Sequence, residues 1–376
     1  MESTKNADIR INNRKRVVNT LFRQGAMTKR DLAERLDLSL ATLTLLLKEL
    51  KAKKLIANGM ALDSTGGRKP LLLEPAYDVK YSVGIEVSQH ELRIVAIDLG
   101  SHVLAKEIYP YGMDTSREYW LKASAVVEEF IAAHIKNPKK LLDIGLALQS
   151  CKNCTDHQEL QQSRETGLNL AMVQSCFRHP LIVRSSAKQA ALAQIWGANH
   201  QDRFVYVYAS SALGGAIVYD HRVIDIELQN CLFGRLLLPA DSFLQSSGSS
   251  KRLEDFCSVN ALCTKTGSDS IGQFFQKLQD GDLLCKKAWE QALDAFSILF
   301  YNLYQIFGWK IVTGGSLSPL LLAYQEDIEK RLAKMAEGTA PYTSYVTVSD
   351  LGVHSAAIGA AMLSIDRFLE TGFNDL

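Results

Sequence analysis

The chain has 376 residues, of which 47% are apolar and 22% are charged, and its formal net charge is +1. The length predicts two or three domains, and the composition is that of a soluble globular protein. No uninterrupted apolar run approaches the roughly 20 residues that cross a membrane, and the opening stretch MESTKNADIRINNRKR lacks the apolar core of an export signal. Seven cysteines at irregular positions suit reduced thiols better than a disulfide framework, so we expect a cytoplasmic protein.

Charge is distributed unevenly along the chain. Residues 1–78 contain 15 Lys and Arg against 9 Asp and Glu, whereas the remaining residues contain 27 against 32. A basic segment attached to a mildly acidic body indicates contact with an anionic polymer at one end only. Basic N-terminal arms are common, however, so this signal needs support from the local pattern.

Residues 1–78, called the head below, contain three short helical patterns. The first, at residues 12–23, has an apolar face and stops at Gly25. Thr28 is expected to cap the second pattern and Ser39 the third. The third pattern has leucines at the i, i+3, i+4 and i+7 positions of a helix core, namely Leu43, Leu46, Leu47 and Leu50. Two short helices joined by a tight turn are typical of a helix-turn-helix, although periodicity alone fits any small three-helix bundle.

The third helical pattern also has a distinctive outer face. Opposite its leucine stripe lie Ala41, Leu45 and Lys48, with Thr42 and Thr44 on the flanks. Ala41 and Leu45 are apolar where water or a partner should be, and thymine methyl groups in the major groove of DNA would suit them. A single exposed leucine needs no special explanation, so packing remains the alternative for Leu45.

Two short apolar runs, residues 55–57 and 71–73, read as strands joined by a loop, which is the pattern of a wing. Within that loop, Gly66 and Gly67 let the backbone pass close to another surface. Arg68 and Lys69 follow directly, and their charges suit phosphates or a narrow minor groove. The loop is therefore a candidate DNA contact.

From Leu21 to Leu73 the chain resembles the winged helix-turn-helix of the ROK family (repressors, open reading frames, kinases), and in particular its NagC/XylR-type repressors. The resemblance is carried by TKRDLAERLDLSLATLTLLLKELKAKKLI and most specifically by STGGRKP. Family repressors have an STGGRPP-like stretch there, which the resemblance implies reaches into DNA. The DNA-binding residues predicted from pattern and resemblance together are Thr28, Lys29, Ser39, Ala41, Thr42, Thr44, Leu45, Lys48, Gly66, Gly67, Arg68 and Lys69.

Residues 79–376 show an α/β pattern that occurs twice. Candidate strands at 81–86, 92–98 and 103–108 precede a helix and a further strand at 143–148, and a second series begins with strands at 204–209 and 214–219. The ROK resemblance covers nearly all of this region and implies the two-lobed, actin-like sugar-kinase (ribonuclease H-like) fold, with lobes at approximately 79–187 and 188–376. For the helical pattern from Lys286 to Phe307, periodicity predicts core packing, and the resemblance adds subunit contacts.

The resemblance also implies which residues a family kinase would use, and this chain departs from them. Bulky residues, Glu86 to His90, stand in place of the first Gly-rich phosphate loop, and Ser210-Ser211-Ala212 replaces the second. Ser186 occupies the position of the catalytic aspartate and Ser185 that of the neighbouring asparagine. A serine without a nearby base cannot accept a proton from a sugar hydroxyl at neutral pH. We therefore expect no kinase activity, no catalytic residue and no nucleotide cofactor.

The family's zinc site, a histidine followed by closely spaced cysteines, is also replaced. Leu232 and Arg235 stand where histidine and glutamate belong, and serines fill most of the cysteine positions. Cys257 and Cys263 have no C-x-x-C partner or nearby histidine. Cys151 and Cys154 do form a C-x-x-C, but without a second pair they read as ordinary thiols. We expect no metal.

A polar set remains where the resemblance places the family's sugar pocket. Its members are Gln149, Ser185, Ser186, Lys188, Arg235 and Glu254. Two readings stay open. Either this set binds a different effector, including an anionic one attracted by Lys188 and Arg235, or the pocket is vestigial.

The sequence thus predicts a bacterial transcriptional regulator, in the first place a repressor of carbohydrate-related genes. It would bind a palindromic double-stranded DNA operator as a dimer or tetramer and sense a sugar or sugar-derived effector through a kinase-dead body. Two alternatives remain: a divergent ROK sugar kinase with a DNA-binding head, and a DNA-binding protein that responds to no effector.

Overall fold

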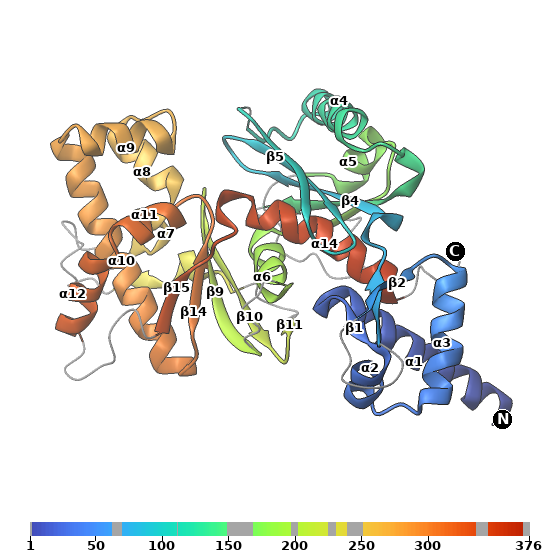
Figure 1. Cartoon of the computed structure of the whole chain (residues 1–376). Helices are drawn as coiled ribbons and strands as arrows, with labels where there is room; N and C mark the ends of the chain where they lie inside the picture. The colour runs from blue at the N-terminus through green and yellow to red at the C-terminus, as the bar shows by residue number, and fades with distance from the viewer. Residues whose placement is uncertain are drawn as a thin grey trace.

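The computed structural model describes the backbone in eight stretches and side chains from residue 9 onward. The described stretches are residues 2–61, 70–110, 112–148, 168–196, 202–224, 231–238, 251–335 and 345–370. Within them the chain forms a small N-terminal head beside a larger body with two five-stranded sheets (Figure 1).

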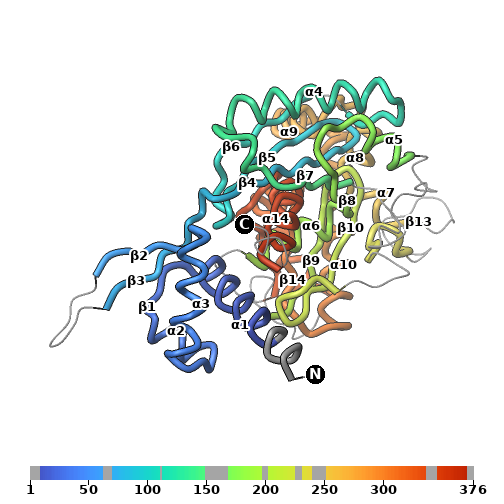
Figure 2. The backbone as a smooth tube through the Cα atoms, turned by 90° about the vertical axis from the view of Figure 1, so that its right-hand side faces the viewer, coloured from blue at the N-terminus to red at the C-terminus, as the bar shows by residue number. Residues whose placement is uncertain are grey.

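The head consists of three helices and a three-stranded sheet of order β1-β3-β2. Its elements are α1 (Glu2–Gln24), β1 (Met27–Thr28), α2 (Lys29–Leu36), α3 (Leu40–Ala52), β2 (Ile56–Ala61) and β3 (Leu71–Pro75). The three predicted helices and both predicted wing strands are confirmed, although α1 begins ten residues before the pattern that announced it. The β2–β3 hairpin projects away from the body (Figure 2).

Local sequence explains where the helices of the head begin. The Thr28 hydroxyl accepts a hydrogen bond from the Asp31 amide at 3.2 Å, and the Ser39 hydroxyl accepts one from the Thr42 amide at 3.1 Å. Both are the predicted N-caps. The four leucines of α3 are all buried, in a core shared with Val17, Leu21 and Leu32.

The first sheet of the body has the order β6-β5-β4-β7-β8. Its strands are β4 (Tyr81–Val87), β5 (Leu92–Asp98), β6 (Val103–Tyr109), β7 (Leu141–Leu148) and β8 (Leu181–Ser185); β4, β5 and β6 are antiparallel neighbours, whereas β7 and β8 run parallel to β4. One face is covered by α4 (Arg117–His134) and α5 (Leu170–Cys176). The other face meets α6 (Ser186–Trp196) and α14 (Ser355–Glu370), as Figure 1 shows.

The second sheet repeats this arrangement, in the order β11-β10-β9-β14-β15. Its strands are β9 (Arg203–Ala209), β10 (Leu213–Tyr219), β11 (Arg222–Val223), β14 (Ile311–Gly314) and β15 (Val346–Val348), and its outer face is covered by α7 (Glu254–Cys257), α8 (Val259–Thr266), α9 (Ile271–Gln279), α10 (Leu283–Phe307), α11 (Ser318–Ala323) and α12 (Gln325–Met335). The short pair β12 (Leu237–Leu238) and β13 (Lys251–Arg252) lies outside both sheets. In each sheet, three antiparallel strands are followed by parallel ones. This shared arrangement confirms the two related halves that the sequence predicted.

The C-terminal helix α14 departs from the predicted division of the body. The sequence assigned all of residues 188–376 to the second lobe, but α14 packs along β4 and β7 of the first sheet. A Cβ added at Gly84 would lie 1.9 Å from the Ala357 carbonyl oxygen, and one at Gly145 would lie 1.9 Å from that of Ala360. Only glycine allows this close approach of helix and sheet. Gly84 and Gly145 therefore let the C-terminal helix α14 pack directly on the first sheet.

The helix α10 is a core element, as its periodicity predicted. Leu293, Phe296, Phe300 and Leu303 are buried against the second sheet. The subunit contacts that the family resemblance implies for this region stay a prediction. Among the helices that the structure describes, none combines the length and apolar character needed to cross a membrane.

Candidate nucleic-acid interface and effector site

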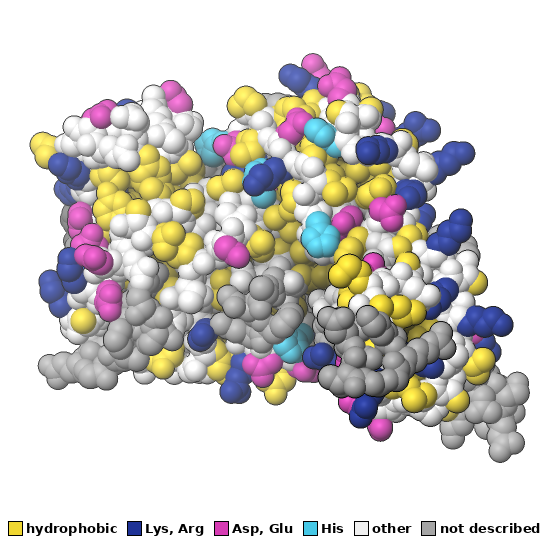
Figure 3. All heavy atoms as spheres, viewed as in Figure 1, with side chains coloured by type: hydrophobic (Ala, Val, Ile, Leu, Met, Phe, Trp, Pro, Cys, Tyr) yellow, Lys and Arg dark blue, Asp and Glu magenta, His cyan; other side chains and the backbone are white. Residues whose placement is uncertain are grey.

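The outer face of α3 is exposed, as expected for a helix that enters a groove. Ala41, Thr44, Leu45 and Lys48 are exposed, and Leu45 has 63% of its surface accessible. Their i, i+3, i+4 and i+7 spacing places them on one side of the helix. Figure 1 draws α3 at the edge of the molecule, and Figure 3 shows apolar and Lys or Arg side chains beside one another over that region. Thr42, on the flank, is half-buried.

Sequence reasoning missed one member of this surface. Leu40, the first residue of α3, is 55% exposed. Together with Leu45 it gives the helix two accessible leucines. Periodicity gave no signal for this exposure, because Leu40 continues the spacing of Leu43, Leu47 and Leu50 and only its place at the start of α3 leaves it uncovered.

Two of the predicted DNA-binding residues have a structural task of their own. Thr28 and Ser39 cap α2 and α3, and the Thr28 hydroxyl also donates to the Asp31 carboxylate at 2.7 Å. Helix N-termini attract phosphate through their unpaired amide groups and the helix dipole. The direct roles of both hydroxyls in DNA contact stay predictions.

Lys29 connects the two helices of the helix-turn-helix. Its ammonium donates a hydrogen bond to the Thr44 hydroxyl, which in turn donates to the Leu40 carbonyl. Lys29 therefore links α2 to α3, which sequence reasoning did not foresee. Lys48, by contrast, is exposed and free to reach a phosphate.

The wing can be described only at its base. The β2–β3 pairing brings Ala61 opposite Leu71, and Met60 is 75% exposed beside it. The four predicted wing residues, Gly66, Gly67, Arg68 and Lys69, lie outside the described residues. The short strands therefore place the loop's two ends together without showing its course.

In the body, a buried ion pair lies at the position that the family resemblance implies for the first phosphate loop. Arg93 on β5 donates to the Glu86 carboxylate at 2.9 Å, and the two side chains are only 5% and 0% exposed. Burial alone would lower the pKa of Arg93, but the adjacent carboxylates, Glu86 foremost, raise it above its ordinary value. Arg93 is therefore a permanent cation inside the protein.

This ion pair also links the two sheets. The Tyr208 hydroxyl, on β9, donates to the other Glu86 oxygen. The Arg93 guanidinium donates to Ser316 at 3.0 Å, and Ser316 is 3.0 Å from the Ser210 hydroxyl. Glu86, at the first phosphate-loop position that the resemblance implies, thus bonds to Tyr208 of the opposite lobe, whereas Ser210, at the second, bonds to Ser316 of its own lobe.

The predicted effector residues are partly gathered. Ser185 and Ser186 are buried where β8 meets α6, and the Ser186 hydroxyl has no hydrogen-bond partner within the described part of the chain. Lys188, two residues after Ser186 on α6, is half-buried, and its charge lowers the pKa of the Cys231 thiol, although burial raises that pKa overall. Gln149 lies outside the described residues.

The other two effector residues come from the second lobe. Arg235 is exposed at the end of the short 3-10 helix at Phe233–Arg235, and Glu254 begins α7. A Cβ added at Gly234 would lie 2.8 Å from a Glu254 carboxylate oxygen and 2.7 Å from the Leu213 carbonyl oxygen, while the Cβ of Ala187 would lie 3.4 Å from one added at Gly214. Leu213 of β10 thus lies near Gly234, which neighbours Glu254, and the next residue, Gly214, lies near Ala187 at the start of α6. Figure 3 shows the surface indented between the parts that carry α9 and β5.

The described residues offer no metal site. Across them, no group of three or more His, Cys, Asp and Glu side chains is arranged to hold an ion. Cys257 is fully buried, its thiol donates to the Leu253 carbonyl at 3.0 Å, and burial raises its pKa. The Cys151-x-x-Cys154 pair lies outside the described residues.

Comparison with known proteins follows the division into head and body. A family model described as the ROK family matches residues 82–367, and one described as winged helix-turn-helix DNA-binding matches residues 12–57. The chain is 20% identical over 379 residues to a xylose repressor of Caldicellulosiruptor bescii, covering 94% of this chain and 95% of the relative.

Two solved structures resemble the model over different spans. A crystal structure of a ROK family transcriptional regulator, a homologue of the E. coli MLC protein, has a TM-score of 0.73 and 19% identity and covers 98% of this chain and 100% of that one. A ROK family glucokinase from Streptomyces griseus, solved with glucose and AMPPNP, has a TM-score of 0.59 and 16% identity and covers 75% and 98%. The predicted fold class, a winged helix-turn-helix joined to a sugar-kinase-like α/β body, is confirmed.

Proposed function

The chain belongs to the ROK family and carries a winged helix-turn-helix at its N-terminus, and on this premise we propose that it is a sugar-responsive transcriptional repressor. It binds a double-stranded DNA operator through the head and senses its effector through the body. The xylose repressor that it resembles along nearly its whole length supports this assignment. We place its action in the cytoplasm, where a bacterial operator lies.

The observation that carries the proposal is the exposed face of α3. Ala41 and Leu45 supply apolar contacts for thymine methyl groups, Thr44 a hydroxyl and Lys48 a cation. The face stands on a rigid unit, because α3 is capped by Ser39, tied to α2 through Lys29 and anchored by four buried leucines. A preformed helix with this mixture of side chains suits a major groove better than a protein core.

The operator is expected to be palindromic. A single recognition helix reads only one half-site, and a homo-oligomer presents two such helices to successive major grooves, about 34–36 Å apart. We propose a dimer or tetramer on this ground. The family resemblance of the α10 region supports its involvement in the subunit contacts.

We propose further that the body is not a kinase. Glu86 and Arg93 fill one phosphate-loop position with buried side chains, and Ser210 at the other is bonded to Ser316. Ser186 replaces the base. The effector residues Ser185, Ser186, Lys188, Arg235 and Glu254 supply hydroxyls, cations and one carboxylate, which suits a sugar or sugar derivative more than a catalytic centre.

Fluorescence anisotropy with DNA from upstream of the protein's own gene tests the proposal. We expect specific binding whose affinity falls by about 0.9 log units per log unit of salt for each phosphate neutralised. Lys48→Ala should reduce that slope by about one. The matched control is Lys334→Ala, a cation in the last turn of α12 far from the head, which should leave the slope unchanged. A protein with no salt-sensitive specific complex is not a repressor of that region.

The kinase alternative is tested separately, because the glucokinase resembles the body in fold. Purified full-length protein is incubated with ATP and a panel of hexoses and amino sugars. We expect no sugar-dependent turnover. Turnover that disappears in Glu254→Gln would restore the enzyme interpretation.

A further inference from the structure

The head and the body share a junction built from parts of the chain that are far apart in sequence. Arg23, at the end of α1, pairs with Asp366 of α14 at 2.7 Å, and its guanidinium lies 4.8 Å from the centre of the Trp196 ring. Beside it, Phe22 packs edge-on against Tyr77. The apolar core of the head continues into Ile365 and Phe368 of α14. The head is therefore docked on the body at this side.

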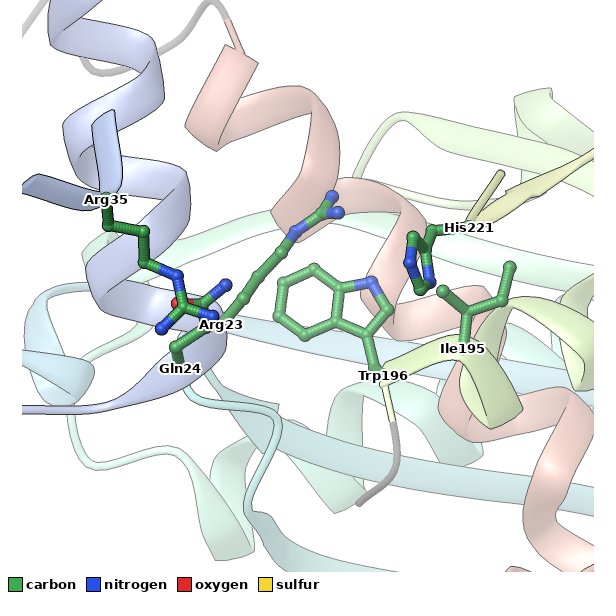
Figure 4. Close-up of a pocket in the computed structure, with 6 residues that line it drawn as sticks. All are labelled: Arg23, Gln24, Arg35, Ile195, Trp196 and His221. Carbon is green, nitrogen blue, oxygen red and sulfur yellow. The ribbon is translucent and has the colours of Figure 1, made fainter. Parts of the chain in front are cut away.

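A pocket of about 530 Å³ opens at this junction. Arg23, Gln24 and Arg35 from the head line it together with Ile195, Trp196 and His221 from the body. Figure 4 shows Arg35 and Gln24 on one side of the Trp196 indole, with Ile195 and His221 on the other and the Arg23 chain extended along the ring. The volume lies within the range of small-molecule sites.

The lining is cationic. Asp366 balances the charge of Arg23, but Arg35 has no ion-pair partner among the residues that the structure describes. Arg35 is exposed in the last turn of α2, whereas the equally exposed Arg30 on the same helix is paired with Glu34 at 2.8 Å. A guanidinium left unpaired at the wall of a pocket can receive an oxyanion through two parallel hydrogen bonds.

The position of His221 is held by an unusual turn. Asp220 and His221 both have positive φ, 51° and 55°, and they connect the paired residues Tyr219 and Arg222 of β10 and β11. Such two-residue turns favour Asn-Gly and Asp-Gly, because the left-handed conformation at the second position disfavours a side chain such as that of His221. His221, whose side chain lines the pocket, nevertheless adopts the left-handed conformation.

From these observations we propose that the head–body pocket binds a small organic oxyanion. Its phosphate or carboxylate group pairs with Arg35, its carbon skeleton lies along the Trp196 indole, and its far end meets Ile195 and His221. Because Arg35 belongs to the helix-turn-helix and His221 to the body, the bound molecule links the two. This pocket is separate from the effector residues around Ser186, so it provides a second ligand input, one next to the DNA-binding unit.

Titration of full-length protein with glucose 6-phosphate, citrate and inorganic phosphate, followed by calorimetry and tryptophan fluorescence, tests the proposal. We expect saturable binding of at least one oxyanion that Arg35→Ala weakens, whereas any binding of glucose that Arg35→Ala leaves unchanged belongs to the effector residues around Ser186. If only glucose 6-phosphate binds, the group is a phosphomonoester; if only citrate binds, it is a carboxylate. Trp196→Phe should remove the fluorescence change while heat is still released, which assigns the signal to the pocket.

Two variants test the two sides of the pocket. Arg35→Ala and His221→Ala should each weaken oxyanion binding, the first by at least about tenfold, since charge-assisted hydrogen bonds contribute about 1.5–3 kcal/mol. Arg30→Ala, on the same helix but outside the pocket, should leave it unchanged. Absence of saturable binding by all three oxyanions, or equal affinity in Arg35→Ala and the parent, would overturn the proposal. Either result leaves operator binding, measured by anisotropy, as an independent test of the repressor function.

Discussion

The buried ion pair between the lobes gives the sharpest test of the structural reasoning. Arg93→Met removes a guanidinium that donates to Glu86 at 2.9 Å, to Glu91 at 2.6 Å and to Ser316 at 3.0 Å. Methionine fills similar space with apolar atoms. Glu86, with no exposed surface, would keep only the Tyr208 hydroxyl as a partner.

The expected loss follows from that burial. Removing one partner of a buried ion pair destabilises a protein by about 3–5 kcal/mol, because the remaining charge is left uncompensated. For a body of about 300 residues that unfolds as one unit, the unfolding entropy is about 0.6 kcal/mol per degree, so the melting temperature should fall by roughly 5–8 °C. Glu86→Leu combined with Arg93→Met should recover part of this loss, since no buried charge remains.

Circular dichroism during thermal and urea unfolding measures the effect. The matched control is Arg30→Met, which breaks a pair of the same chemistry at 2.8 Å whose side chains are 83% and 65% exposed. That change should leave the melting temperature unchanged within error, because an exposed pair contributes little to stability. If Arg93→Met lowered the stability as little as Arg30→Met, Glu86 would be hydrated or protonated in the variant. The description of a buried ion pair that links the two sheets would then be wrong.

The remaining predictions concern the DNA interface and one buried histidine. Leu45→Gln should change the preferred operator sequence more than the total affinity, as read by selection from a random DNA library; a uniform loss would assign Leu45 to packing. Arg68→Ala with Lys69→Ala should weaken operator binding in anisotropy while the melting temperature stays unchanged, and unchanged affinity would count against the wing. Burial is the main reason why the pKa of His354 falls from 6.5 to about 4. The unfolded chain then takes up a proton between about pH 6.5 and 4 that the folded chain does not, so stability falls as the pH drops through this window. In His354→Gln, urea unfolding at pH 7 and pH 4.5 should show a smaller decline, and an equal decline would contradict this cause.

Much of the head could be predicted because its signals are local. A cap depends on a residue and the amide two or three positions later, as at Thr28 and Ser39. The buried stripe of α3 depends on a 3.6-residue period, which set the core leucines apart from Leu45. The body strands followed from runs of apolar residues, and β5 has the predicted bounds. The DNA contacts assigned to these elements stay predictions.

The candidate effector site could be predicted only as a set of residue types at family positions. Ser185 and Ser186 proved to be buried side by side because a strand ends and a helix starts there. Glu254 lies beside Gly234, a neighbour of Leu213 on β10, and the next residue of that strand, Gly214, lies beside the start of α6, a relation that no spacing in the sequence expresses. Sequence reasoning identified bulk at Glu86 as the loss of a phosphate loop, but it did not anticipate that Arg93 would pair with it.

By itself, then, the sequence determined the elements of the head, the caps of α2 and α3 and the exposed face of α3, because each depends on residues close together in the chain. Tertiary structure alone decided which distant groups meet. It joined Glu86 to Tyr208 across 122 positions and Arg23 to Asp366 across 343, and it laid α14 on the first sheet. Such partners meet because an unpaired buried charge destabilises the folded state. A local sequence pattern cannot predict which distant residues will pair.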